Sequence, residues 1–251
     1  MCGTCGCGDA AGPRIAVPHD HDAHDHPHPH DHLSPGGGTT ITLEQKVLAK
    51  NDALAERNRN HLADHRIVAV NLMSSPGAGK TTLLERTIRD TAGRRAVSVI
   101  EGDQETLLDA DRIRRTGCPV VQVNTGAGCH LDAAMTYRAL TALAPPDRSL
   151  VFIENVGNLV CPALFDLGES AKVVIISVTE GTDKPCKYPH MFAVADLVVV
   201  NKVDLLPYVD FDLESCQAHV KAVNPGAGLI ALSATTGDNV SSWYDWLAAR
   251  G

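Results

Sequence analysis

Residues 74–81 read Ser74-Ser75-Pro76-Gly77-Ala78-Gly79-Lys80-Thr81, directly after a predicted strand at 67–73 and at the start of a predicted helix at 80–92. In this context glycines let backbone N–H groups approach phosphate oxygens, the lysine brings a cation to the outer phosphates, and the threonine hydroxyl can ligate magnesium. Ser74 stands where the general pattern has Gly, so the loop must accommodate a Cβ there. We interpret the stretch as a phosphate-binding loop rather than an ordinary Gly-containing turn.

Apolar runs alternate with helical patterns on both sides of this loop. The predicted strands are 67–73, 97–101, 119–123, 149–153, 172–178, 197–201 and 229–232. The predicted helices are 42–64, 80–92, 104–116, 131–143, 186–194, 214–223 and 240–250. Such alternation predicts an α/β fold with a doubly wound, mostly parallel sheet, in which ligands lie beyond the carboxyl ends of the strands.

A second motif, Asn201-Lys202-Val203-Asp204, follows the predicted strand 197–201. The Asp204 carboxylate can accept two hydrogen bonds from adjacent N–H groups on guanine, which adenine does not offer. The stem of Lys202 can cover the base, and Asn201 can hold the loop. Ser233-Ala234, after the last strand, resembles a further guanine-contacting loop, although a plain turn explains these two residues nearly as well.

Two acidic residues follow other strands of the predicted sheet. Asp103 comes after 97–101, and Glu154 comes after 149–153. Magnesium prefers oxygen ligands and often keeps several waters, so each carboxylate can act on the ion directly or through water. The alternative is that each is a solvated loop acid.

Composition limits the possible classes of protein. The 251 residues are 44% apolar but only 4% aromatic, which suits an aliphatic core under a parallel sheet and one ordinary domain. The net charge of −8 argues against a nucleic-acid surface. The sequence has neither an apolar run of about 18 residues nor the layout of a signal peptide, so we expect a cytoplasmic protein whose cysteines are thiols and metal ligands.

Residues 1–40 differ from the rest, and we divide the chain into this disordered, metal-binding tail and a nucleotide-binding domain at 41–251. The tail's five Asp and one Arg carry half of the net charge of −8. Its seven histidines are interleaved with Asp and predict moderate-affinity storage of divalent metals: His19, His21, His24, His26, His28, His30 and His32. Cys2, Cys5 and Cys7, with the terminal amine, favour Ni²⁺ or Cu²⁺; a zinc half-site or redox-active thiols are the alternatives.

A further candidate metal site involves Cys129-His130 and Cys161, which lie in two loops at the nucleotide edge of the predicted sheet. If the loops meet, one chain offers three ligands, and a two-fold dimer could bridge a metal between copies. Cysteine is also commonly a small buried apolar residue, which is the alternative for this trio. We interpret the remaining Cys and His as ordinary structural or surface residues: Cys118, Cys186, Cys216, His61, His65, His190 and His219.

Taken together in order, several motifs resemble the HypB family of hydrogenase nickel-incorporation GTPases. They are Ser-Ser-Pro-Gly-Ala-Gly-Lys-Thr-Thr, Glu-Gly-Asp, Thr-Gly-Ala-Gly-Cys-His, Glu-Asn-Val-Gly-Asn-Leu-Val-Cys-Pro and Asn-Lys-Val-Asp. The resemblance covers residues 42–251, and Cys-x-x-Cys-Gly-Cys and the His tract resemble the family's optional metal-binding arms.

The resemblance implies a P-loop NTPase of the signal-recognition and nitrogenase-iron-protein-like class: a magnesium-dependent GTPase that dimerises with GTP and helps insert nickel into a [NiFe]-hydrogenase precursor. Its expected ligands are GTP, Mg²⁺, Ni²⁺ and Zn²⁺, and its expected partners are a second copy, a nickel-binding maturation chaperone and the hydrogenase large-subunit precursor. The implied catalytic residues are Lys80, Asp103 and Glu154, with Thr81, Asp103 and Glu154 on magnesium. The implied nucleotide contacts are Gly77, Gly79, Lys80, Thr81, Thr82, Asn201, Lys202, Asp204, Ser233 and Ala234. The implied metal ligands are Cys2, Cys5, Cys7, Cys129, His130, Cys161 and the tail histidines.

Two alternatives remain open. The urease accessory GTPase resembles this chain next best, but its Cys-Pro-His motif is split here between two loops. A nickel or zinc storage protein would explain the His tract but none of the phosphate and guanine loops.

Overall fold

A computed structural model describes residues 37–103, 108–126 and 128–250 of the chain. Its centre is a seven-stranded sheet with the order β3-β2-β4-β1-β5-β6-β7, and every neighbouring pair is parallel. The strands are β1 (Val68–Ser74), β2 (Val97–Asp103), β3 (Val120–Asn124), β4 (Leu150–Glu154), β5 (Ala171–Ser177), β6 (Leu197–Asn201) and β7 (Gly228–Ala231). The predicted doubly wound α/β fold is confirmed, with a sheet that is entirely parallel.

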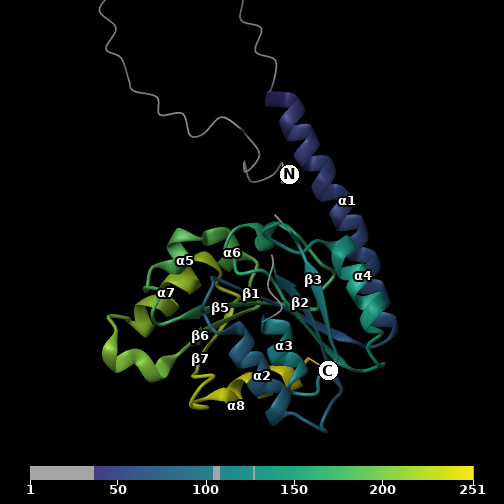
Figure 1. Cartoon of the computed structure of the whole chain (residues 1–251). Coiled ribbons are helices and arrows are strands. Elements are labelled where there is room, and N and C mark those ends of the chain that lie inside the picture. Colours follow the sequence, from purple (N-terminus) through teal and green to yellow (C-terminus); the bar gives the residue numbers. More distant parts are fainter. Residues whose placement is uncertain (1–36, 104–107, 127, 251) are drawn as a thin grey trace, which may run out of the picture.

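Helices cover both faces of this sheet (Figure 1). One face packs against α2 (Lys80–Asp90), α3 (Leu108–Arg114) and α8 (Val240–Ala248). The other face packs against α1 (Gly37–Asp64) and α4 (Ala133–Leu143) over one half of the sheet, and against α6 (Pro189–Ala193) and α7 (Leu213–Val223) over the other half, with α5 (Lys184–Lys187) beside α7.

Alternation along the strands builds the two layers of the core. In β1, Val70 and Leu72 pack on the face of α2 and α8, whereas Ala69 and Met73 pack on the opposite face. Both sets are fully buried or nearly so, because a parallel sheet is covered on both sides. The aliphatic core expected from the low aromatic content is present.

The predicted helix 186–194 is wrong in detail, because the structure has two short helices, α5 and α6, with a break at Tyr188. Pro189 follows the break. A proline removes a backbone donor and pushes the preceding residue out of the α region, and Tyr188 has φ −126° and ψ 52°.

The first helix begins at Gly37, five residues before its predicted start at 42 and inside the predicted tail. Glycine and threonine have low helix propensity, so the segment 37–41 carries no pattern that would predict it. Two 3₁₀ helices, η1 (Cys161–Leu164) and η2 (Val203–Tyr208), were not predicted.

Candidate functional site

The phosphate-loop stretch lies between the end of β1 and the first turn of α2, as its sequence context predicts. Gly77 and Gly79 have φ of 76° and 98°, which is the left-handed region where a Cβ is unfavourable. A Cβ on Gly79 would also collide with the Asn201 side-chain amide. Both glycines are therefore required by the path of the loop.

Lys80 and Thr81 begin α2 and are already engaged with neighbouring side chains. Lys80 Nζ donates to Ser74 Oγ at 2.7 Å, and Thr81 Oγ1 donates to Glu154 Oε1 at 2.6 Å. Burial lowers the pKa of Lys80, an effect opposed by the Glu154 carboxylate. Ser74, where the general pattern has Gly, thus supplies an acceptor that orients the lysine.

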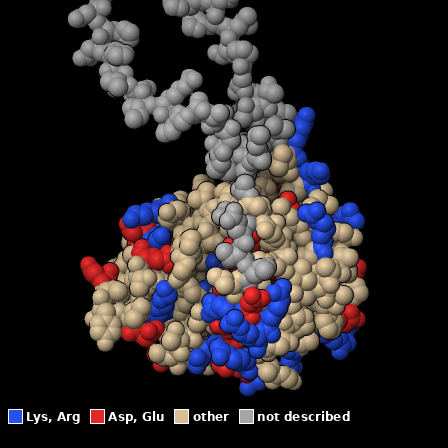
Figure 2. Space-filling view, in the orientation of Figure 1, with Lys and Arg blue, Asp and Glu red and all other residues tan. Residues whose placement is uncertain are grey.

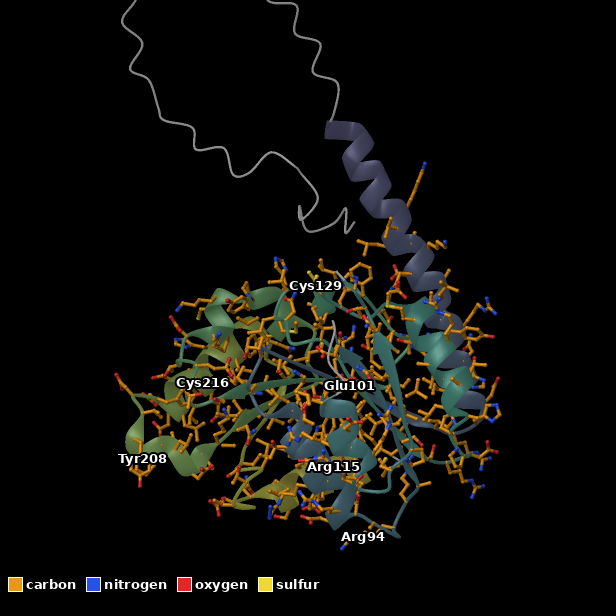
Figure 3. The ribbon with its side chains drawn as sticks, viewed as in Figure 1. Arg94, Glu101, Arg115, Cys129, Tyr208 and Cys216 are labelled. Carbon is orange, nitrogen blue, oxygen red and sulfur yellow. The ribbon has the colours of Figure 1, made fainter. Side chains whose placement is uncertain are left out.

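Glu154 lies beside a second buried carboxylate that the sequence reasoning did not select, Glu101. The two residues are paired in register on β4 and β2, and 3% and 2% of their surfaces are exposed. Within the described chain, Oε2 of each has no hydrogen-bond partner. Burial raises the pKa of Glu101 to about 8, helped by the nearby Glu154, and burial also raises the pKa of Glu154. Figure 3 shows Glu101 deep within the fold.

The signal that could have found Glu101 is the motif Glu101-Gly102-Asp103 itself. Because side chains alternate along a strand, the face that carries Val99 also carries Glu101, and that face packs on α2. Burying an ionised carboxylate at such a position costs free energy unless the group binds a cation or is protonated.

A cavity of about 500 Å³ opens in front of these groups. Its lining joins the phosphate loop and the start of α2 to the end of β2, to α3, to the segment after β4 and to Lys202. The lining residues are Pro76, Gly77, Gly79, Lys80, Thr81, Thr82, Asp103, Asp109, Arg112, Glu154, Val156, Gly157 and Lys202. Asp103 and Glu154, which the sequence placed at strand ends, are therefore brought to one site. The sequence reasoning missed Arg112, whose Nη2 donates to Thr82 Oγ1 at 3.1 Å and to Glu85 Oε2 at 2.7 Å.

The Asn201-Lys202-Val203-Asp204 segment borders the same loop. Asn201 Nδ2 donates to the Ala78 carbonyl at 2.9 Å, and Lys202 Nζ donates to the Gly77 carbonyl at 2.8 Å. Asp204 Oδ1 is buried without a hydrogen-bond partner among the described residues. The motif is thus hydrogen-bonded to the phosphate loop, and its Asp204 Oδ1 is an acceptor that a ligand can use.

Ser233 and Ala234 lie next to this segment, after β7. Asn201 Oδ1 accepts a hydrogen bond from the Ala234 N–H at 3.0 Å, so this amide orients the motif in the described structure. If Ala234 also contacted guanine directly, its backbone N–H would have to be shared between Asn201 Oδ1 and the base.

The second candidate site brings together Cys129, His130 and Cys161. One ligand atom from each lies within 4.8 Å of the other two, so the two loops do meet. His130 stacks on Phe165 with ring centroids 3.9 Å apart, and burial lowers its pKa, opposed by Asp132. A neutral imidazole offers a lone pair to a metal. The chemistry of two sulfurs and one nitrogen suits a borderline or soft divalent cation.

Asn155 connects the two sites. It directly follows Glu154 and is 1% exposed. Its Oδ1 accepts hydrogen bonds from the N–H groups of Leu131 at 3.1 Å and Val156 at 3.0 Å, and its Nδ2 donates to Asn71 at 3.3 Å. Leu131 directly follows His130. One buried amide therefore fixes both the end of β4 and the loop that carries Cys129 and His130.

Two asparagines of α1 bind the backbone of the segments next to His130. Asn58 Nδ2 donates to the carbonyls of Ala133 and Leu167, both at 2.9 Å, and Asn51 Oδ1 accepts from the Ala133 N–H at 2.9 Å. Phe165, which stacks on His130, lies two residues before Leu167. The first helix thus positions the start of α4 and the segment that supports His130.

The other cysteines and histidines have ordinary surroundings. Cys118 and Cys216 are buried apolar residues, and Cys186 is exposed. His65 Nδ1 lies 2.8 Å from Asp147 on the surface. The tail candidates, Cys2, Cys5, Cys7 and the seven histidines between His19 and His32, lie outside the described residues. No described helix is long and apolar enough to span a membrane.

Comparisons with known proteins found a matching family model and several similar proteins. A family model described as the nucleotide-binding domain of CobW/HypB/UreG matches residues 68–231. The hydrogenase maturation factor HypB of Rhizobium leguminosarum bv. viciae is 56% identical over 207 residues, which cover 82% of this chain and 69% of that protein.

Two solved structures are similar in sequence and in fold, both with a TM-score of 0.75. The hydrogenase maturation factor HypB of Archaeoglobus fulgidus is 44% identical, and the match covers 80% of this chain and 98% of that one. HypB of Helicobacter pylori in complex with nickel is 36% identical, with coverage of 80% and 94%.

Proposed function

Because this chain belongs to the HypB family of hydrogenase maturation factors, we propose that it is a GTPase that uses hydrolysis to control the transfer of nickel into a [NiFe]-hydrogenase precursor. One observation carries the proposal. At the end of β4, Glu154 is hydrogen-bonded to Thr81 of the phosphate loop, and the next residue, Asn155, is hydrogen-bonded to the loop of Cys129 and His130.

In this proposal the phosphate loop binds GTP through the backbone amides around Gly77 and Gly79 and through α2's N-terminus. Lys80 exchanges its hydrogen bond to Ser74 for phosphate oxygens. A cationic amine held against the outer phosphates stabilises the charge that develops as the terminal phosphoryl group leaves. Arg112 lies on the cavity wall where it could add to this stabilisation.

The carboxylates of this cavity fit a divalent cation. Glu101 and Glu154 each hold a buried oxygen without a partner among the described residues, and two such acids in register repel unless a proton or a cation lies between them. Thr81, Asp103 and Glu154 would hold magnesium, which when bound would neutralise phosphate charge. One of these two carboxylates, Asp103 or Glu154, would also orient the attacking water.

Guanine selectivity is assigned to Asp204, whose unpartnered oxygen is already desolvated. Guanine presents two adjacent donors, and their hydrogen bonds to Asp204 would offset that desolvation cost. Adenine lacks this pair of donors and would leave the carboxylate oxygen unsatisfied. Asn201 and Lys202 hold the motif against the phosphate loop, so base and phosphate recognition are built on one rigid unit.

Nickel is the cargo at Cys129, His130 and Cys161. Three ligands leave the set incomplete for a four-coordinate ion, and a second copy of the chain would complete it. Val160 and Leu164, which flank Cys161, are large apolar residues that are 54% and 45% exposed. We assign this exposed apolar surface to a GTP-dependent homodimer.

The tail is assigned to nickel and zinc binding, with Cys2, Cys5 and Cys7 as a tight site and the histidines as a store. The proposed partners are a nickel-binding maturation chaperone and the hydrogenase large-subunit precursor, met in the cytoplasm, where the thiols stay reduced. A urease-type role is disfavoured because Cys161-Pro162 is followed by Ala163 rather than His. A pure storage role leaves the nucleotide cavity unexplained.

Nickel transfer to purified hydrogenase precursor tests the proposal. The nickel-loaded chain would be incubated with the precursor in GTP, GDP or a non-hydrolysable GTP analogue, beside Lys80→Ala and Cys161→Ala variants. We expect transfer with GTP and loss of transfer in both variants. Equal transfer with GTP and GDP would show that the nucleotide does not control the metal.

A further inference from the structure

A second cavity lies at the opposite edge of the sheet from the phosphate loop, at the amino ends of β2 and β4. It measures about 510 Å³, and its apolar lining includes Val97, Leu150 and Leu247. Val97 and Leu150 are register partners, so the floor is a rigid part of the sheet. This size and this apolar floor are typical of a small-molecule site.

Four arginines line the cavity, and its lining among the described residues includes no carboxylate: Arg66, Arg94, Arg95 and Arg148. Within the described residues none of the four forms an ion pair, although Arg59, Arg86, Arg112 and Arg114 all do. The four come from three loops, with Arg94 and Arg95 adjacent in one of them, in a chain whose net charge is −8. Figure 2 shows Lys and Arg side chains gathered on the lower part of the molecule, around α2 and α3.

Arg95 is the most constrained of the four. Its Nε donates to the Arg148 carbonyl at 2.9 Å and its Nη2 to the Ser149 carbonyl at 3.0 Å. Partial burial lowers its pKa, since the cation is desolvated without a carboxylate to compensate. A guanidinium that is held in place and lacks a counter-ion is prepared for an anionic ligand.

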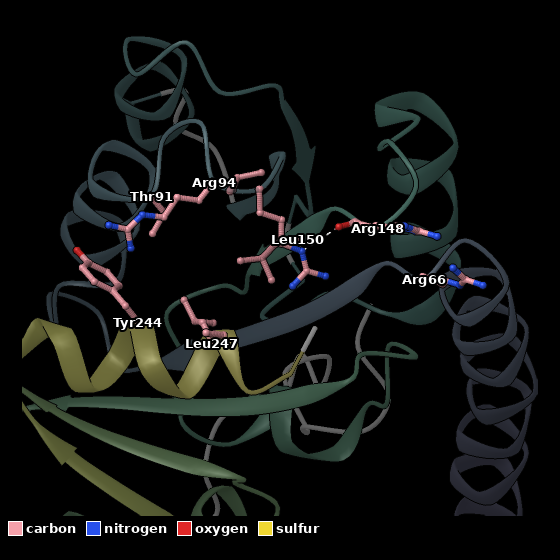
Figure 4. A pocket seen from close by; sticks show the side chains of 10 residues that line it. Arg66, Thr91, Arg94, Arg148, Leu150, Tyr244 and Leu247 are labelled. Atoms are coloured by element: carbon pink, nitrogen blue, oxygen red, sulfur yellow. Dashed lines mark hydrogen bonds between the residues drawn. The ribbon is translucent and has the colours of Figure 1, made fainter.

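The other arginines differ in direction, since the side chains of Arg66 and Arg148 point away from the hollow (Figure 4). Arg94 lies near Thr91 on the side of Tyr244, whereas Arg66 and Arg148 lie beyond Leu150. Arg66 and Arg148 have φ of 54° and 62°, a left-handed conformation that is unfavourable for a residue with a Cβ. The Arg148 N–H donates to the His65 carbonyl at 2.9 Å, which ties the two turns together.

We propose that this cavity binds a small organic anion in which a ring or short apolar body carries a phosphate or carboxylate group. The apolar body would rest on Val97, Leu150 and Leu247. The anionic group would lie between Arg94 and Arg95, since a guanidinium can donate two parallel hydrogen bonds to either group. The site is separate from the GTP cavity and shares no lining residue with it.

Phenyl phosphate is a suitable probe, added to the full-length chain after Mg·GDP has saturated the phosphate loop. Binding would be followed by calorimetry and by tryptophan fluorescence. The chain has two tryptophans, Trp243 and Trp246, and both lie on α8, which lines the cavity with Tyr244 and Leu247. We expect saturable binding that weakens with added salt, and at least fivefold weaker binding of inorganic phosphate and of phenol.

Arg94→Met is the main variant, because the Arg94 side chain forms no hydrogen bond or ion pair with the described residues, and the backbone N–H that donates to the Thr91 carbonyl at 3.1 Å is kept, so the fold should stay intact. Arg115→Met is the matched control: Arg115 is also exposed and lies outside the cavity. We expect at least fivefold weaker phenyl phosphate binding in Arg94→Met and unchanged binding in the control. Arg95→Met should weaken binding further, with its melting temperature measured alongside.

Three outcomes would overturn the proposal. The first is no saturable binding by either method. The second is equal affinity in Arg94→Met and Arg115→Met. The third is inorganic phosphate binding as tightly as phenyl phosphate, which would mean that the apolar floor takes no part.

Discussion

At the scale of the residue, Asp204 has the sharpest assigned role in the nucleotide site. Its buried Oδ1 has no partner in the described structure, so a ligand with donors satisfies it at little further desolvation cost. The surrounding motif is already held by Asn201 and Lys202, and the carboxylate can be altered without removing those contacts.

Asp204→Asn should therefore weaken GTP binding and strengthen the binding of xanthosine triphosphate. The asparagine side chain has an NH₂ donor in place of one carboxylate oxygen. This donor can bind the carbonyl that xanthine has in place of the amino group of guanine, whereas it repels that amino group. The loss for GTP should be about 1.5 to 3 kcal/mol, the range of a charge-assisted pair. Competition binding with both nucleotides measures it.

Asp210→Asn is the matched control, because Asp210 is an exposed acid six residues further along the chain. It should leave both affinities unchanged. If wild-type protein bound ATP and GTP equally, Asp204 would have no role in selecting the base.

The cysteines differ in their expected reactivity. Burial raises the pKa of the Cys118 and Cys216 thiols to about 11, whereas Cys186 is exposed. At pH 8 only about one in a thousand of the buried thiols would be a thiolate, the form that reacts. Iodoacetamide at pH 8 should therefore alkylate Cys186 and spare Cys118 and Cys216 until guanidinium is added, as peptide mass spectrometry would show. Alkylation of Cys118 in the native protein at the rate of Cys186 would contradict this.

At the scale of the element, the end of β4 is the connection between the two sites. Glu154 contacts the phosphate loop, Asn155 contacts Leu131, and a Cβ on Gly157 would lie 3.2 Å from Pro76. Loss of the terminal phosphate could shift this segment. The shift would be passed to the loop of Cys129 and His130 through the hydrogen bond between Asn155 and Leu131.

Asn155→Ala should reduce the dependence of nickel affinity on the nucleotide. Reciprocal coupling between two sites typically amounts to 5- to 150-fold, and we expect the variant's ratio of nickel affinities with GDP and with a non-hydrolysable GTP analogue to fall toward one. Nickel titration of tail-deleted protein in both nucleotide states measures this ratio.

Asn224→Ala is a control for the loss of an amide that binds the backbone. Asn224 Nδ2 donates to the carbonyls of Phe192, Ala193 and Ala195, at the amino ends of β6 and β7 and not at the carboxyl ends of the strands, where both sites lie. This variant should lose stability but keep the nucleotide-dependent ratio. A ratio that fell equally in both variants would assign the effect of Asn155 to general destabilisation.

At the scale of the whole molecule, the tail and the α/β domain are expected to act separately. Removing residues 1–36 deletes the seven tail histidines and the three N-terminal cysteines but leaves α1 from Gly37. GTP hydrolysis should be unchanged, because the phosphate and guanine motifs lie outside the deletion, whereas binding of several nickel ions should be lost. Equilibrium dialysis with nickel and a phosphate-release assay measure the two effects. Unchanged nickel stoichiometry would contradict the assigned storage role.

The sequence by itself determined the class of fold and the position of each motif along it. Apolar periodicity places the seven strands within a few residues, and the glycines of the phosphate loop are specified by local backbone conformation. These signals are local: a strand needs an alternating or buried run, and a left-handed turn favours glycine, wherever the rest of the chain lies. The break at Tyr188 was also present in the sequence, as Pro189.

Only the tertiary structure decided which motifs meet. The pairing of β2 with β4 places Glu101 beside Glu154, although 53 positions separate them in the sequence. The sheet order likewise brings Cys161 to Cys129 and His130 and lets Asn155 bind Leu131. Strand order depends on the packing of helices over both faces, which no single segment encodes, and the burial that raises the pKa of Glu101 exists only once those layers have closed.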